Sequence, residues 1–285
     1  MMFASEVKKV RILEWCERFR RRIPVPVEDV EVSTSFGRTR ALIAGPRDAP
    51  PLVLLHGALA SSAHVLPELG PLLQTRRVYA LDVIGQSPWS EDRRLDVSGN
   101  DYGQWLSEAC TALGLDTFDL FGVSWGGFVA MRGAIVAPER INSLVLMVPA
   151  GIVGNSVWAS LRDAGIAILL YRMFPSPARL EKAVRSQFTT LDPDWSAYFG
   201  EALLAYNLDM RIPPLVTPED AARVRCPMLV FGAENDASFP GRALLDRVKH
   251  LFPQARTEFI AGSKHCPPLT DAFRAWMAEK VNALR

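Results

Sequence analysis

The stretch FDLFGVSWGGFVAMRGA, residues 118–134, begins with strand-forming residues and ends with helix-forming ones. Between the two halves lies Ser124, with Gly122 two positions before it and Gly126 two positions after it. Bending a strand directly into a helix strains the backbone at the corner, and side chains two positions away would collide there. Because glycine has no side chain, the pattern G-x-S-x-G predicts a tight corner that holds the serine hydroxyl clear of the sheet.

The predicted corner also gives Ser124 a particular electrostatic environment. The helix that follows directs its first backbone N–H groups and the positive end of its dipole toward the hydroxyl. The alternative interpretation is a glycine-rich turn with an incidental serine, which would have the same sequence pattern. The two interpretations differ in what they require elsewhere, because a nucleophilic serine needs a base and the base needs an orienting acid.

Candidates for the base come from only four histidines. His265, in IAGSKHCPPL, follows the last predicted strand, whereas His250 lies within a charged helical segment, where we expect a solvated or packed role. Loops after parallel strands gather at one edge of the sheet, the edge that also carries Ser124. We expect the acid at Asp236, directly after the preceding strand, with Glu234 as the alternative. The chain order Ser, Asp, His is the one expected for such a corner.

Acyl transfer also needs donors for the charge that develops on the carbonyl oxygen, and each donor is worth about a hundred- to a thousandfold in rate. The sequence predicts an oxyanion hole formed by the backbone N–H of Trp125 and that of Ala58, in the turn after PLVLLHG (51–57). His56 in the same turn is a second histidine at a strand end. We expect it to hydrogen-bond the loop as a structural residue.

Short apolar runs alternate with helical patterns along most of the chain. Continuous runs such as PLVLLHG indicate strands buried on both faces. Their alternation with helices indicates a mainly parallel sheet covered on both sides. Before this pattern begins, residues 27–46 predict two antiparallel strands around a turn near Phe36. The expected strands are 51–57, 76–83, 117–123, 141–149, 227–233 and 255–262, and the expected helices include 64–74, 101–114, 126–137, 240–252 and one near the C-terminus.

A helical insertion of three or four helices is predicted from about residue 151 to residue 224, where the alternation stops. Residues 1–150 and 225–285 then form the core, with an N-terminal helix in 1–23, and 151–224 form a cap. The cap and the corner predict a largely apolar pocket, although an aromatic stripe at helical spacing is more often core than ligand contact. The residues concerned are Trp125, Phe128, Trp158, Ile166, Leu169, Leu170, Tyr171, Met173, Phe174 and Phe188.

The composition is that of an ordinary globular protein, with 49% hydrophobic and 22% charged residues among 285. The formal net charge of +1, from 32 basic and 31 acidic residues, gives no reason to expect nucleic acid as a partner. The cysteines lie far apart without metal-binding spacing, which indicates reduced thiols in a cytoplasmic protein; we expect the one beside His265 to be an inert thiol. They are Cys16, Cys110, Cys226 and Cys266.

The N-terminal segment has scattered charges and no apolar h-region, so it does not read as a signal peptide. No run approaches the ~18 apolar residues of a membrane span. Val7, Val10 and Leu13 share one helical face, with Phe3 as a possible fourth member. We expect this helix to dock on the domain, with a membrane-surface helix as the alternative.

The chain resembles the α/β-hydrolase superfamily over residues 25–285. LDVIGQS (81–87) is similar to that family's D-x-x-G-x-G-x-S loop, with Gln86 where a second glycine is usual, and DVIGQSPWS together with SGNDYGQWL resembles a subset of bacterial carboxylesterases. The residues that carry the resemblance are His56, Gly57, Ala58, the corner Gly122-Val123-Ser124-Trp125-Gly126-Gly127, Gly232, Asp236 and His265.

The resemblance implies an eight-stranded, mostly parallel sheet with helices on both faces and a helical cap inserted after the sixth strand. It implies a Ser124–His265–Asp236 triad that forms an acyl-enzyme, no metal and no organic cofactor. We therefore expect a serine hydrolase acting on a small-molecule carboxylic ester. Lactone, amide, carbon–carbon bond or peroxide chemistry on the same triad is the alternative, since one fold hosts many reactions. A non-catalytic ligand receptor is a further alternative, whose usual sign is a broken triad.

Overall fold

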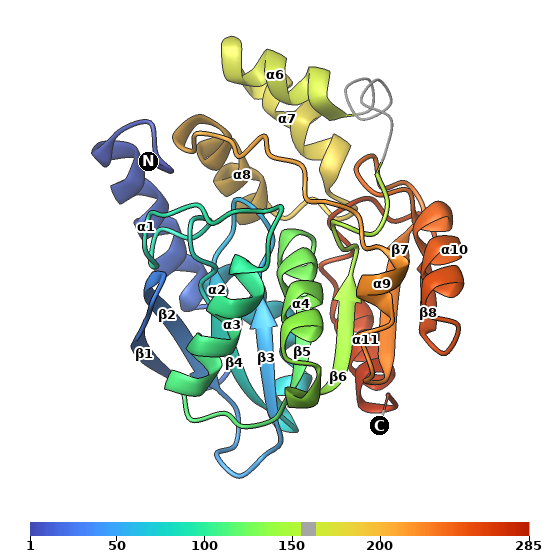
Figure 1. Cartoon of the computed structure of the whole chain (residues 1–285). Helices are drawn as coiled ribbons and strands as arrows, with labels where there is room; N and C mark the ends of the chain where they lie inside the picture. The colour runs from blue at the N-terminus through green and yellow to red at the C-terminus, as the bar shows by residue number, and fades with distance from the viewer. Residues whose placement is uncertain (155–163, 285) are drawn as a thin grey trace.

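An eight-stranded sheet lies at the centre of the molecule (Figure 1). The computed structural model describes residues 1–154 and 164–284. In the strand order β1-β2-β4-β3-β5-β6-β7-β8, β2 runs antiparallel to both β1 and β4, and all other neighbours are parallel. The strands are β1 (Val27–Thr34), β2 (Gly37–Ala44), β3 (Pro51–Leu55), β4 (Arg77–Leu81), β5 (Phe118–Val123), β6 (Ile141–Met147), β7 (Met228–Ala233) and β8 (Arg256–Ile260). The predicted mostly parallel eight-stranded sheet is confirmed.

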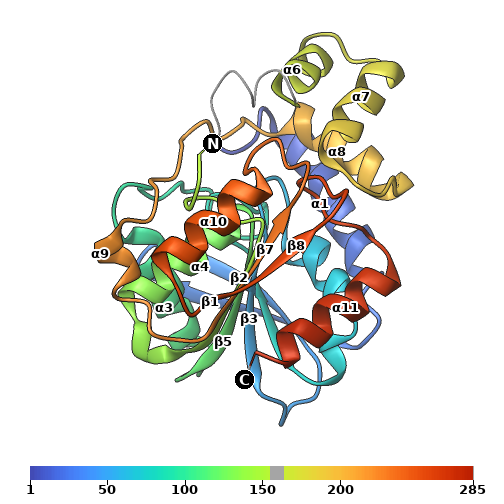
Figure 2. The same ribbon diagram turned by 90° about the vertical axis from the view of Figure 1, so that its right-hand side faces the viewer.

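Helices cover both faces of this sheet, as the edge-on view of Figure 2 shows: α3, α4 and α10 lie on one face, and α1, α2 and α11 on the other. The helices of the core are α1 (Glu6–Arg20), α2 (Ser62–Val65), α3 (Asp101–Ala112), α4 (Trp125–Val136), α10 (Gly241–Leu251) and α11 (Asp271–Asn282), and those between β6 and β7 are α6 (Ile166–Met173), α7 (Pro177–Gln187), α8 (Pro193–Ala205) and α9 (Pro218–Ala221).

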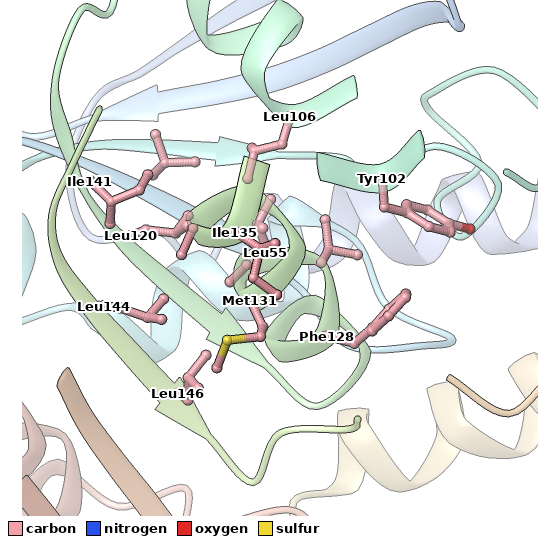
Figure 3. Packing of buried hydrophobic residues seen from close by; sticks show 14 of the residues in the cluster. Leu55, Tyr102, Leu106, Leu120, Phe128, Met131, Ile135, Ile141, Leu144 and Leu146 are labelled. Atoms are coloured by element: carbon pink, nitrogen blue, oxygen red, sulfur yellow. The ribbon is translucent and has the colours of Figure 1, made fainter. Parts of the chain in front are cut away.

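Side chains alternate between two hydrophobic cores along the central strands. In β3, Val53 and Leu55 pack on the side of α3 and α4, whereas Leu52 and Leu54 pack on the opposite side, and all four are fully buried. Figure 3 shows the first of these cores, in which Leu55 lies with Met131 and other side chains of the sheet and of α4. This two-sided burial explains why the strands read as continuous apolar runs.

The predicted helix over 64–74 is wrong. The segment breaks into α2 and two short 3-10 turns, η1 (Leu66–Leu69) and η2 (Leu72–Gln74). Pro67, Gly70 and Pro71 lie in and between these pieces. Since proline removes a backbone donor and glycine weakens a helix, the apolar periodicity of the segment does not produce one continuous helix.

The exposure of α6 differs from the expectation that its apolar residues pack into a core. Ile166, Leu169, Leu170, Met173 and Phe174 are between 44% and 57% exposed. Tyr171 and Phe188 are buried as expected, and Trp158 lies outside the described residues. The apolar stripe of α6 therefore faces away from the core.

The N-terminal helix docks on the core, but through another face than the predicted one. Ile12 and Phe19 are fully buried, whereas Val7 is 69% and Val10 47% exposed. Phe19 packs against rings of α8, with its centroid 4.8 Å from that of Trp195. Val7 and Val10 share one face of the helix, but the buried residues Ile12, Cys16 and Phe19 lie on a different face. That face carries the aromatic ring that packs against α8.

Within residues 1–154 and 164–284, no helix has both the length and the apolarity needed to cross a bilayer. All four cysteines are unpaired.

Replacing Ile12 by alanine should lower the free energy of unfolding by about 2–5 kcal/mol, because it leaves a cavity in the core beneath α1. Val10→Ala on the exposed side of the same helix should change it by less than about 0.5 kcal/mol. Urea denaturation of both variants measures the difference. Equal losses would show that α1 does not dock through the Ile12 face.

Candidate active site

Ser124 occupies a strained corner between β5 and α4. Its backbone angles are φ 52 and ψ −113, a region that residues with a side chain rarely adopt. A Cβ on Gly122 would lie 2.4 Å from the Gly126 carbonyl oxygen, and one on Gly126 would lie 2.3 Å from the Leu55 carbonyl oxygen. Only glycine fits at both positions, so the two glycines make the corner possible.

Backbone hydrogen bonds to the end of β6 hold this corner in place. The N–H of Ser124 donates to the carbonyl of Met147 at 2.9 Å, and the N–H of Ala150 donates to the carbonyl of Ser124 at 3.0 Å. Because both partners belong to the neighbouring parallel strand or its exit, the position of the serine is set by the sheet.

Three predicted residues meet at the carboxyl edge of the sheet. The Ser124 hydroxyl lies 2.9 Å from Nε2 of His265, and Nδ1 of His265 lies 2.8 Å from Oδ2 of Asp236. The second oxygen of Asp236 accepts the N–H groups of Ser238 and Phe239 at 2.7 and 3.0 Å. The acid is thus held by the loop after β7, the imidazole by the loop after β8 and the hydroxyl by β5.

The charge of Asp236 controls the protonation of His265. Burial lowers the pKa of His265, but the Asp236 carboxylate, through its charge and its hydrogen bond, raises it by more, so that the pKa lies above its usual value. The Asp236 side chain is fully buried, and that of His265 is 16% exposed. The imidazole can therefore reach a ligand on the solvent side while its other nitrogen is tied to a buried carboxylate.

The alternative candidates do not join this group. Glu234 is exposed, and its carboxylate accepts the backbone N–H of Gly262 at 2.8 Å. His250 is exposed near the end of α10. The geometry therefore separates Asp236 from Glu234, which the sequence left as alternatives.

His56 holds the turn after β3, as expected of a structural residue. Its Nε2 accepts the N–H of Val83 at 2.9 Å, and its Nδ1 therefore donates to the carbonyl of Gly57 at 2.7 Å. Burial lowers the pKa of His56 to about 4, so the ring stays neutral. The Gly57 carbonyl belongs to the same planar peptide as the N–H of Ala58, so His56 fixes the direction of that N–H.

The turn carrying Ala58 lies against Ser124. A Cβ on Gly57 would stand 3.3 Å from Cβ of Ser124 and 3.8 Å from its Oγ. The next residue, Leu59, has a positive φ of 55, and its carbonyl accepts the hydroxyl of Tyr198, on α8, at 2.6 Å. Trp125 directly follows the serine at the start of α4. The two predicted oxyanion donors therefore lie in segments adjoining the hydroxyl.

The DVIGQS loop after β4 supports the site without joining it. Asp82 is fully buried and accepts hydrogen bonds from the N–H and hydroxyl of Ser62 and from the hydroxyl of Ser87, at 2.7–2.9 Å. Burial raises the pKa of Asp82 to about 6, against the effect of these bonds. Gln86, where the related pattern has glycine, donates to Asp209 at 3.2 Å. These supporting contacts were not predicted from the sequence.

Three further observations concern reactive or ligand-binding features outside this group. Burial raises the pKa of the Cys266 thiol to about 12, which keeps it protonated near neutrality and fits the expected inert thiol. No cluster of three or more metal-ligating side chains occurs in the part of the chain that the structure describes. A solvent-open groove along α1 contains none of the three predicted catalytic residues; it is lined by Val10, Leu13, Glu14, Glu17, Arg21 and Trp89.

A family model of the Alpha/beta hydrolase family matches residues 52–279. The chain therefore belongs to this family.

Its relatives include two proteins of Bacillus subtilis (strain 168). The chain is 28% identical over 249 residues to the uncharacterized carboxylesterase nap, covering 85% of this chain and 82% of the relative. It is 25% identical over 286 residues to carboxylesterase YbfK, covering 93% and 90%. The crystal structure of naproxen esterase (carboxylesterase NP) from Bacillus subtilis superimposes with a TM-score of 0.81 at 26% identity, covering 98% of each chain.

The raised pKa of His265 predicts the pH dependence of any reaction that uses it as a base. The neutral imidazole is the active form, so kcat/KM should rise with pH and reach half its plateau above the ordinary histidine value of about 6.5. In Asp236→Asn the raising charge is lost and burial remains, so the residual activity should have its midpoint at lower pH. Rates measured from pH 5 to 9 test this. Glu234→Gln is the matched control and should leave the midpoint unchanged. An equal shift of the midpoint in both variants would contradict the assignment of Asp236 as the acid.

Proposed function

We propose that this protein hydrolyses carboxylic esters, with Ser124 as nucleophile, His265 as general base and Asp236 as the acid that orients the imidazole. The observation that carries the proposal is the unbroken hydrogen-bonded series from hydroxyl to imidazole to buried carboxylate, at 2.9 and 2.8 Å. Two relatives that match most of the chain are carboxylesterases by name. The protein is accordingly a carboxylic ester hydrolase.

The geometry gives each residue a step in the reaction. His265 takes the proton of the Ser124 hydroxyl as Oγ attacks the ester carbonyl, and the Asp236 carboxylate stabilises the imidazolium that forms. The backbone N–H groups of Ala58 and Trp125 bind the oxyanion of the tetrahedral intermediate. The imidazolium then protonates the leaving alcohol, which leaves an acyl group on the serine.

The second half of the reaction repeats these roles with water as the nucleophile and Ser124 as the leaving group. A water molecule replaces the alcohol, and neutral His265 removes one of its protons as the oxygen attacks the acyl-enzyme. The second tetrahedral intermediate uses the same two N–H donors. Its collapse releases the carboxylic acid and returns the proton to Ser124, so the cycle consumes one ester and one water and needs no further reactant.

The proposal also covers the cap and the cellular compartment in which the protein acts. We take residues 151–224 as the cap, and its helices α6, α7 and α8 lie beyond the edge of the sheet toward which the parallel strands point (Figure 1). The short helix α9 lies beside the core instead, where the Asp220 carboxylate is 3.5 Å from the Arg132 guanidinium on α4. We place the reaction in the cytoplasm, since four cysteines that all stay unpaired fit a reducing compartment.

Replacing Ser124 by alanine should lower the turnover of short-chain p-nitrophenyl esters by at least about a thousandfold, since no other group replaces the nucleophile. It should also abolish covalent labelling by a fluorophosphonate. Initial rates and gel fluorescence measure the two effects. Ser33→Ala, at an exposed position of the edge strand β1, is the control and should keep full activity. An active Ser124→Ala enzyme would remove the proposed mechanism.

A further inference from the structure

The cap contributes a short strand-like segment to the loop that carries His265. Phe188, at the end of α7, forms a parallel bridge with Cys266. The N–H of Cys266 donates to the carbonyl of Gln187 at 2.8 Å, and the N–H of Thr189 donates to the carbonyl of Cys266 at 3.1 Å. The residue paired with the cap is thus the direct neighbour of His265.

The hydroxyl of Thr189 extends this pairing to the other side of the histidine. It donates to the carbonyl of Cys266 at 2.8 Å and accepts the N–H of Lys264 at 2.9 Å. It also lies 3.2 Å from the hydroxyl of Ser263, which is fully buried. One side chain of the cap therefore bonds backbone groups both immediately before and immediately after His265.

The segment that carries Thr189 is itself anchored in the cap. The ring of Phe188 is buried, with its centroid 5.3 Å from that of Phe199 and 5.9 Å from that of Trp195, both on α8. The Lys264 ammonium reaches back to the carbonyl of Arg185 on α7. The segment that carries Thr189 is therefore packed against the rest of the cap and is not a free loop.

Contacts from the core alone hold the imidazole and its loop at fewer points than contacts from the core and cap together. Asp236 holds Nδ1, and the ring of Phe239 lies edge-on with its centroid 5.6 Å from that of His265. The backbone of the loop bonds to the loop after β7 only before the histidine: the N–H of Asn235 donates to the carbonyl of Ser263 at 2.7 Å, and the N–H of Gly262 donates to the Glu234 carboxylate at 2.8 Å, among the described residues. On the C-terminal side of the histidine, the contacts with Gln187 and Thr189 supply the support.

We propose that Thr189 is a positioning residue for His265, which fixes the backbone on both sides of the base so that Nε2 stays in line with the serine hydroxyl. The proposal rests on the function proposed above, because it assigns the cap a part in aligning that same base. Misplacement of a catalytic group by about 1 Å can cost up to about a hundredfold in rate. A cap residue distant in sequence thus controls the rate of the chemical step.

Thr189→Val tests the proposal, because valine keeps the shape of threonine and removes the hydroxyl together with its contacts to Lys264, Cys266 and Ser263. We expect kcat to fall about tenfold or more, within the range that misalignment of a catalytic group can reach, with KM changed less than about twofold. The acid limb of the pH profile should move to lower pH, because a looser Asp236 contact leaves burial to lower the pKa of His265. Thr189→Ser keeps the hydroxyl and should restore most of the rate.

The adjacent threonine is the matched control. Thr190 is also half-buried and accepts the N–H of Leu269 at 3.2 Å, further along the same loop. Thr190→Val removes this one bond and should lower stability no more than Thr189→Val, and it should leave kcat and the pH profile near those of the unchanged enzyme. Equal kinetic effects of the two valine variants, measured well below the melting temperature of each, would overturn the proposal.

A readout independent of turnover separates this inference from the proposed function. The Nδ1 proton of His265, shared with Asp236, should give a downfield proton NMR signal in the unchanged protein and in Thr190→Val. In Thr189→Val the signal should weaken or move upfield. An unchanged signal in Thr189→Val would overturn the inference even if the esterase activity stands. A lost signal in a protein without ester turnover would support the positioning role and contradict only the proposed function.

Discussion

The backbone of Ser124, at φ 52, is the constraint on which the site depends. A residue with a side chain adopts such a conformation at a cost of about 1–3 kcal/mol, which the surrounding structure must offset. Here the two flanking glycines avoid clashes that a side chain would make at the corner, and the hydrogen bonds to the end of β6 hold Ser124 in this conformation. Leu59 and Val148 also have positive φ, so the described non-glycine residues with this strain lie in the segments that follow β3, β5 and β6. The strain is confined to the edge where Ser124, His265 and Asp236 meet.

The sequence predicts the sheet and the corner well because both depend on local patterns. Continuous apolar runs reflect strands buried on two faces, and the two glycines around Ser124 reflect a backbone approach that admits no other residue. Parallel topology then brings Asp236 and His265 to the same edge as the serine without any knowledge of side-chain contacts. The choice between Asp236 and Glu234, two residues apart, needed the direction in which each side chain points.

The features that sequence could not predict depend on contacts between distant segments. The apolar periodicity of 64–74 favours one helix, whereas Pro67, Gly70 and Pro71 disfavour it. These helix-breaking residues prevail, and the segment forms short separate turns. The docked face of α1 is decided by the rings of α8 that receive Phe19. Thr189 bonds Lys264, 75 positions away in the sequence, and Cys266, 77 positions away. Through these two neighbours it supports His265. No motif marks such a threonine, since its role arises only from the cap packing against the loop.

The acyl-enzyme on Ser124 is the central intermediate of the proposed mechanism, and trapping that species tests the mechanism most directly. The enzyme is mixed with an excess of an activated ester, quenched in acid within milliseconds, digested and analysed by mass spectrometry. The proposed mechanism predicts a burst of alcohol close to one equivalent per enzyme when deacylation is the slower half of the cycle, and an acyl mass on the peptide containing Ser124. An acyl group on another residue, or turnover without any acylated peptide under conditions that show a burst, would contradict it.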